Sequence, residues 1–386
     1  MYDLKIVGGT IVDGTGGNRY SGDVGIKDGK IVDIGKCGES AAETIDASGA
    51  IVTPGFVDIH THYDGQISWD EELTPSSIHG VTTCAMGCCG VGFAPVRPTD
   101  HAKLVELMEG VEDIPGTALS EGISWGWESF PEYMDVLDRM PHSIDFMAHV
   151  PHDALRVYVM GERAVHDEAA TDQDIAEMRR LLRESLEAGA VGFSTGRSDN
   201  HRSAVGDWSP ASEADGKELA GIAEAFNGLG YGVLQAVSDF NILHGDEHFD
   251  AEWGVLEQMQ SAAPDRPMSV STMQRDHSPE QWKWILDRAS KANEKGREVR
   301  CQVGARGIGV MLGLQATFHP FMGFPSYKAI SQLTLEERVA AMRNPELKAK
   351  MIAEQSEPVA GDGSMLPPLA DYFLSNLDMV AMRLFR

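Results

Sequence analysis

The chain has 386 residues, of which 42% are hydrophobic and 24% charged, and this composition excludes a disordered or fibrous protein. Lys and Arg number 32 against 59 Asp and Glu, so the formal net charge is −27, and a field of this sign repels nucleic acid and anionic lipid. The amino end lacks the apolar core of a secretory signal, and no stretch reaches the roughly 18 apolar residues of a membrane span. We therefore expect a cytoplasmic protein with no nucleic-acid or membrane partner.

The first 53 residues have the pattern of a small β module. Apolar and polar residues alternate from Leu4 to Ile6, which is typical of a half-buried strand. Asp28-Gly29 lies between two further strand-like runs, and this dipeptide favours a tight hairpin turn. We predict that residues 1–53 form one structural module and that residues 54–386 form a second.

The second part alternates apolar runs with helical stretches. Residues 50–60 end in polar side chains, as expected of a buried parallel strand whose carboxyl end carries function. Six similar runs follow, at 80–90, 144–150, 190–196, 231–237, 266–273 and 298–304. Thr171, Asp174 and Gly189 delimit a helix over 171–189, and a helical, polar stretch covers 333–355. The sequence thus predicts the α/β class and a TIM-type (β/α)8 barrel, with the eighth strand not found.

His60-Thr61-His62 follows the first of these strands. Residues two apart on an extended strand point to the same side, so both imidazoles can reach one metal ion at about 2.0–2.1 Å. The alternative is a pair of incidental surface histidines. Asp64 follows closely and is either a partner that orients one imidazole or a turn residue.

Three of the five cysteines lie within residues 84–89, a spacing that does not fit a disulfide framework. The glycines around them allow close backbone approach at the end of the second strand, beside His62 in a barrel. A thiolate at this place is a plausible zinc ligand. For Cys84 and Cys88 a role as small core thiols is equally open.

Further polar residues follow the third and fourth strands, where the carboxyl rim of a barrel holds its site. His152 is predicted to donate a hydrogen bond to a substrate oxygen. Arg197 and Arg202 are predicted to bind a substrate carboxylate, because the planar guanidinium can form two parallel hydrogen bonds. Either arginine could instead pair with one of the chain's own acidic side chains.

Five segments together resemble the amidohydrolase superfamily, close to its N-acyl-D-amino-acid deacylase (D-aminoacylase) group. They are VTPGFVDIHTHYD, GVTT, GCCG-x3-APVRP, HVPHDALRVYVMGERA and GFSTGR. The resemblance implies a (β/α)8 barrel with a small β-sandwich built from both chain ends. It also implies one or two Zn²⁺ ions, with His60, His62 and Cys89 matching metal ligands. The implied reaction is hydrolysis of an amide by zinc-activated water.

The sequence departs from that pattern in three places. Where the family has histidine ligands after strands five and six, this chain has QAVSD and VSTMQ, and His277 is the nearest substitute. Strand four carries no lysine for carbamylation, and the family's catalytic aspartate of strand eight is absent. These departures motivate the hypothesis that the sequence is a truncation or a fragment, completed by another chain or working as a homo-oligomer.

We therefore expect a metal-dependent hydrolase that cleaves the amide bond of an N-acyl, D-configured amino acid or a similar small amide. The alternative is a catalytically incomplete fragment, subunit or pseudoenzyme of the same family. The two differ in whether His60→Ala abolishes turnover in a folded protein.

Overall fold

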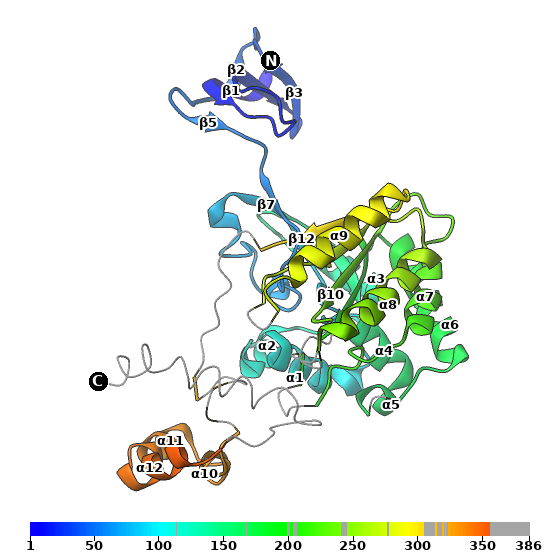
Figure 1. Ribbon diagram of the computed structural model, residues 1–386. Coiled ribbons are helices and arrows are strands. Elements are labelled where there is room, and N and C mark those ends of the chain that lie inside the picture. The colour runs from blue at the N-terminus through cyan, green and yellow to red at the C-terminus, as the bar shows by residue number, and fades with distance from the viewer. Residues whose placement is uncertain are drawn as a thin grey trace. The chain divides into compact units, whose positions relative to one another are not determined.

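The computed structural model of the chain forms two compact units (Figure 1). One comprises Met1–Asp58 and Pro75–Thr83, and the other comprises Ile59–Thr74 and the described residues from Cys84 onward. The structure describes residues 1–355 except 113, 167, 199–200, 204–206, 241–244, 276–277, 305–312, 315–318, 320 and 322.

The first unit contains a five-stranded sheet in the order β3-β2-β1-β4, with β5 also paired to β1. The strands are β1 Tyr2–Ile11, β2 Tyr20–Lys27, β3 Lys30–Gly35, β4 Ala41–Asp46 and β5 Ile51–Val52. β2 and β3 pair antiparallel with Lys27 opposite Lys30, and Asp28 and Gly29 both have positive φ. The predicted hairpin turn is therefore confirmed.

The second sheet has seven strands in the order β12-β11-β10-β9-β8-β7-β6. They are β6 Phe56–Asp58, β7 Val81–Met86, β8 Asp145–Pro151, β9 Gly192–Arg197, β10 Val233–Ser238, β11 Met268–Ser271 and β12 Val299–Gln302. The four pairings from β8 to β12 are parallel. Each strand lies beside the one before it in the chain, as in repeated βα units. All seven predicted strands are present, and no eighth strand follows β12 within the described residues.

Helices connect the strands and cover them. They are α1 His101–Glu112, α2 Gly116–Gly122, α3 Phe130–Asp138, α4 His152–Met160, α5 Glu162–Val165, α6 Asp172–Glu187, α7 Gly216–Ala223, α8 Phe249–Ala262, α9 Gln281–Glu294, α10 Pro325–Lys328, α11 Leu335–Met342 and α12 Pro345–Ala353. In chain order α6 packs on α7, and α7 packs on α8 (Figure 1). None of the described helices is both long enough and apolar enough to cross a membrane.

Helix α6 begins and ends where its sequence predicts. Thr171 accepts a hydrogen bond from the Asp174 backbone N–H, and the Asp174 carboxylate accepts one from the Thr171 backbone, which is the predicted capping box. Gly189 follows the helix with a φ of 114°, a conformation that glycine adopts without strain. The buried side of α6 includes Ile175, Met178 and Leu182, which pack toward the core at helical spacing.

The predicted helical stretch over 333–355 is two helices rather than one. α11 ends at Met342, and α12 begins at Pro345 with Asn344 as its cap. Proline has no N–H to continue a helix and restricts the residue before it, but it is well accepted in the first turn. The pair packs with α10 around Phe324, Tyr327 and Met351.

Candidate metal centre

His60 and His62 lie just beyond the carboxyl end of β6. Thr61 between them donates both its backbone N–H and its hydroxyl to the Ala85 carbonyl oxygen, at 2.8 and 2.7 Å. These two bonds tie the segment to β7 and orient the imidazoles. The ring centroids are 5.3 Å apart in an edge-to-face arrangement. Both histidines therefore face one region, as the two-residue spacing predicts.

Cys89 reaches the same region from the turn after β7. Its backbone has a φ of 56°, and Gly87 and Gly90 beside it also have positive φ. A methyl group at Gly87 would lie 2.3 Å from the His149 carbonyl oxygen, so glycine is required for this close approach. The Cys89 N–H donates to Gln235 Oε1 at 3.0 Å, which fixes the turn from β10.

The three residues predicted as metal ligands come together. His60 Nε2 lies 3.0 Å from Cys89 Sγ. One donor atom from each of His60, His62 and Cys89 lies within 4.8 Å of the other two, and this is the single such group of three or more found among the described residues. Cys84 and Cys88 are fully buried and stand outside this group.

The protonation of these side chains suits a metal ion. Burial, followed by the charges of His60 and His201, keeps the pKa of His62 well below its usual range. The ring is therefore neutral, which is the form that binds metal. Burial, and next the charge on Glu112, raises the pKa of the Cys89 thiol, so a nearby cation is needed to hold the thiolate. The donor set of two nitrogens and one sulfur fits zinc.

Two more histidines lie close to this group, and the sequence did not mark them as ligands. Burial, and then the charge of His60, lowers the pKa of both His149 and His201 to about 4. Their Nδ1 atoms, like that of His62, are buried and have no hydrogen-bond partner among the described residues. His277 lies outside the described residues.

Two carboxyl groups, the buried Asp64 and the partly buried Glu112, complete the surroundings. Burial raises the pKa of Asp64 to about 7. Burial, and next the charge of Asp64, raises the pKa of Glu112 to about 8. Glu112 Oε1 lies 3.2 Å from His62 Nε2. Sequence reasoning missed Glu112, although an acidic residue that ends a helix opposes the helix dipole and could have served as a signal.

The structure gives other partners to the residues predicted to bind substrate. His152 is fully buried, with Nδ1 3.0 Å from Thr195 Oγ1 and Nε2 3.0 Å from Glu218 Oε1. Arg197 forms a two-pronged contact with Glu252 at 2.9 and 3.0 Å. The guanidinium of Arg202 lies 3.7 Å from the centre of the Trp208 ring. Neither arginine is solvent-exposed, and substrate binding by all three stays a prediction.

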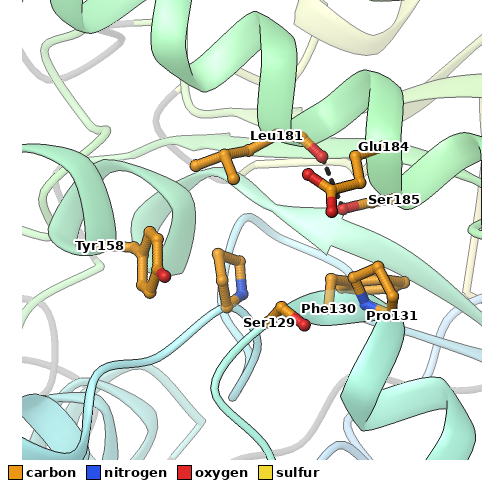
Figure 2. Close-up of a pocket in the computed structure, with 8 residues that line it drawn as sticks. Ser129, Phe130, Pro131, Tyr158, Leu181, Glu184 and Ser185 are labelled. Atoms are coloured by element: carbon orange, nitrogen blue, oxygen red, sulfur yellow. Dashed lines mark hydrogen bonds between the residues drawn. The ribbon is translucent and has the colours of Figure 1, made fainter.

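The unit that begins at Ile59 also contains a hollow, and it lies apart from the candidate metal centre. Figure 2 shows it between α3, α4 and α6, lined by Phe130, Tyr158 and Leu181 among others. The Ser185 hydroxyl within it donates to the Leu181 carbonyl at 2.8 Å. None of the three predicted metal ligands lines this hollow, so the chemistry is expected at the strand ends instead.

A sheet built of βα repeats, with two histidines and a thiol converging at its strand ends, defines an α/β protein with a candidate metal centre. The chain belongs to the Amidohydrolase family, which its residues 43–363 match.

The curated relatives include a D-aminoacylase and two N-acyl-D-amino-acid deacylases, as well as D-hydantoinases. D-aminoacylase of Alcaligenes xylosoxydans xylosoxydans is 36% identical over 196 residues, covering 50% of this chain and 38% of that protein. N-acyl-D-aspartate deacylase of the same organism is 32% identical over 227 residues, or 58% of this chain and 41% of that protein. The chain thus spans about two fifths of the length of these relatives.

Solved structures agree with this family. A D-aminoacylase crystal structure, described as defining a novel subset of amidohydrolases, aligns with a TM-score of 0.65 and 25% identity over 92% of this chain and 70% of that one. N-acyl-D-glutamate deacylase from Bordetella bronchiseptica, solved with zinc and a phosphonate inhibitor, aligns with a TM-score of 0.59 and 28% identity, covering 78% and 58%.

Proposed function

We propose that this chain is a zinc-dependent amidohydrolase that releases the acyl group from an N-acyl-D-amino acid or a similar small amide. The observation that carries the proposal is the convergence of His60, His62 and Cys89 within 4.8 Å of one another. The activities of the relatives support the substrate class. They favour this function over that of a catalytically inactive subunit or pseudoenzyme.

We assign each predicted site residue either metal binding or substrate binding. His60 and His62 supply neutral nitrogen donors, and Cys89 supplies a thiolate, for one or two zinc ions. When bound, zinc lowers the pKa of a coordinated water to about 7 and polarises a carbonyl oxygen. Arg197 and Arg202 are proposed to bind the substrate carboxylate, and His152 to donate to the developing oxyanion. For Arg197 this requires that the substrate compete with Glu252, its present partner.

The family resemblance and the strand order also support a proposal for the two parts of the fold, the barrel and the small β-sandwich. The curved run of seven strands is the larger part of a TIM-type (β/α)8 barrel, and residues 54–386 belong to it. Residues 1–53 are proposed as part of a small β-sandwich, of which one sheet is described. A cytoplasmic location, and completion of the site by another chain or a second copy, stand as further parts of the proposal.

The test combines metal analysis with turnover. The purified chain is measured for zinc per chain by elemental analysis and assayed for amino acid release from N-acetyl-D- and N-acetyl-L-amino acids. We expect bound zinc and release from D-configured substrates, both lost on chelation. His60→Ala should lose both while remaining folded by circular dichroism. His248→Ala, a change at an exposed histidine, is the matched control and should keep both. A folded wild-type chain without zinc or turnover would contradict the proposal.

A further inference from the structure

Two side chains, one from β9 and one from β10, bind the backbone of the turn that carries Cys89. The Cys89 N–H donates to Gln235 Oε1 at 3.0 Å. The next N–H, that of Gly90, donates to Ser194 Oγ at 3.1 Å. The Ser194 hydroxyl donates in turn to the Gly87 carbonyl oxygen. Ser194 therefore joins the two ends of the turn, and Gln235 holds its middle.

We propose that Ser194 and Gln235 are positioning residues of the metal centre, which hold the Cys89 turn in the conformation that presents the thiol before the metal binds. This inference rests on the proposed zinc site and adds two residues to it. Neither residue is proposed as a ligand, because the oxygen atom of each side chain faces the backbone of the turn.

The conformation of the turn explains why it needs such support. Cys89 has a φ of 56°, in the left-handed region that residues other than glycine rarely adopt. Such a conformation persists where surrounding contacts determine it. Consecutive N–H groups in a turn of this kind can form an anion-binding concavity. Here side-chain oxygens accept from both N–H groups, so the turn is built to hold the thiol rather than an anion.

The two supporting residues occupy matched places in the sheet. Ser194 and Gln235 are direct partners in the parallel pairing of β9 and β10, so their side chains point to the same side of the sheet. They are 0% and 1% exposed, and water therefore does not compete for their hydrogen bonds. A methyl group on Gly90 would lie 2.6 Å from the Gly196 backbone nitrogen. The turn thus lies directly against β9, and two paired strands set its position.

The hydrogen bonds also indicate which substitutions are conservative. A backbone N–H only donates, so the oxygen of the Gln235 amide must face Cys89. The Gln235 Nε2 atom is buried and has no hydrogen-bond partner among the described residues. Gln235→Glu therefore keeps an acceptor oxygen and removes only that donor, whereas Gln235→Leu removes the acceptor at similar size. In the same way Ser194→Thr keeps the hydroxyl and Ser194→Ala removes it.

The first experiment needs no metal. Hydrogen exchange of the full metal-free chain is followed by mass spectrometry in the peptide that contains residues 87–90. We expect Ser194→Ala and Gln235→Leu to exchange about 2- to 10-fold faster than wild type in this peptide, and Ser194→Thr and Gln235→Glu to stay close to wild type. The matched control is Ser185→Ala, which removes a buried hydroxyl that donates to a backbone carbonyl in α6 and should leave this peptide unchanged.

The second experiment measures zinc affinity by competition with a chromophoric chelator. We expect Ser194→Ala and Gln235→Leu to weaken zinc binding about 10-fold, and the thiolate charge-transfer band of their cobalt-substituted forms to weaken. Ser194→Thr and Gln235→Glu should recover most of the affinity. Ser185→Ala should lose stability in thermal melting but keep its affinity. If Ser194→Ala fails to fold, Gln235→Leu and Gln235→Glu provide the comparison.

A merely structural role predicts a different pattern. Equal losses of zinc affinity in Ser194→Ala and Ser185→Ala would overturn the inference, as would unchanged exchange of the turn peptide in both Ser194→Ala and Gln235→Leu.

The outcomes also separate this inference from the proposed function. A wild-type chain that binds no zinc contradicts the metal centre itself, while the exchange measurement still tests whether the two side chains hold the turn. A wild-type chain that binds zinc, together with Ser194→Ala and Gln235→Leu variants of equal affinity, contradicts only the roles of Ser194 and Gln235.

Discussion

The Nδ1 atom of His60 lies 2.8 Å from Oε1 of Gln302, although 242 residues separate them in the chain. Gln302 is the last residue of β12, and its side-chain amide also donates to the Ile59 carbonyl at 3.2 Å. The end of the last described strand therefore meets the segment that carries the first predicted metal ligand. The orientation of His60, which follows β6, therefore depends on Gln302 in β12, and these two strands stand at opposite ends of the seven-strand order.

This contact predicts that Gln302→Ala weakens zinc binding about 10-fold or more, because His60 loses the acceptor that fixes its ring. Gln302→Glu keeps an acceptor toward His60 but loses the hydrogen bond to the Ile59 carbonyl, so it should weaken zinc binding less than Gln302→Ala does. Gln258→Ala changes an exposed glutamine on α8 and serves as the control. Chelator competition measures all three, and equal affinity of Gln302→Ala and wild type would contradict the role of the contact.

A second prediction concerns the close approach of β9 to the Cys89 turn. A methyl group on Gly196 would lie 2.2 Å from the Cys89 carbonyl oxygen and 3.0 Å from His201 Nδ1. We expect Gly196→Ala to lower the free energy of unfolding by about 1–3 kcal/mol and to weaken zinc binding. Gly254→Ala in α8 has no atom within 4 Å of the added methyl group. That control should raise stability by about 0.5–1 kcal/mol in a urea titration.

A third prediction concerns pH. Burial raises the pKa of Asp153 to about 7 from 3.8, and its Oδ2 atom has no hydrogen-bond partner among the described residues. The folded state therefore binds a proton more tightly than the unfolded state, so ionisation of Asp153 lowers stability as pH rises from about 4 to 7. Asp153→Asn removes this loss. Its stability relative to wild type should increase by at least about 1.4 kcal/mol between pH 5 and pH 8.

Urea titrations at the two pH values measure that difference. Asp138→Asn alters an exposed aspartate at the end of α3 and should show no comparable change. An Asp153→Asn variant whose stability relative to wild type is the same at both pH values would show that Asp153 is ionised without penalty.

A fourth prediction distinguishes a structural role of Arg197 from a role in substrate binding. Glu252→Gln leaves the buried guanidinium without its charged partner and should cost about 3–5 kcal/mol of unfolding free energy. Asp250→Asn breaks the more exposed pair with Arg288 and should cost less than about 1 kcal/mol. Arg197→Lys should in addition raise KM for an N-acyl-amino acid. An unchanged KM in that variant would limit Arg197 to a structural role.

Patterns local in sequence accounted for most of the fold. The apolar runs located all seven strands, and Thr171 with Asp174 located the start of α6. The prediction of a helical stretch over 333–355 does not place the break before Pro345, because a proline in the first turn of a second helix leaves the helical pattern on both sides intact. The expected sandwich and domain boundaries remain predictions.

The site was predictable only where its residues form a motif. His60 and His62 form an HxH motif just after β6, Cys89 stands next to Gly90 after β7, and their convergence follows from the neighbouring positions of these two strands. Glu112 and Gln302 have no such signature, because each reaches the site by tertiary packing from a helix end or a distant strand. Spatial neighbours of this kind cannot be read from spacing alone.

The arrangement of the second sheet also has a consequence for biosynthesis. Since every strand from β7 to β12 is added beside its predecessor, the sheet can grow in step with translation, each new strand pairing with the one synthesised before it. The bond between His60 and Gln302 joins residues 242 apart in the chain, so it must wait until the last described strand has been synthesised. Full orientation of the His60 ring is therefore a late event, which follows assembly of the sheet rather than guiding it.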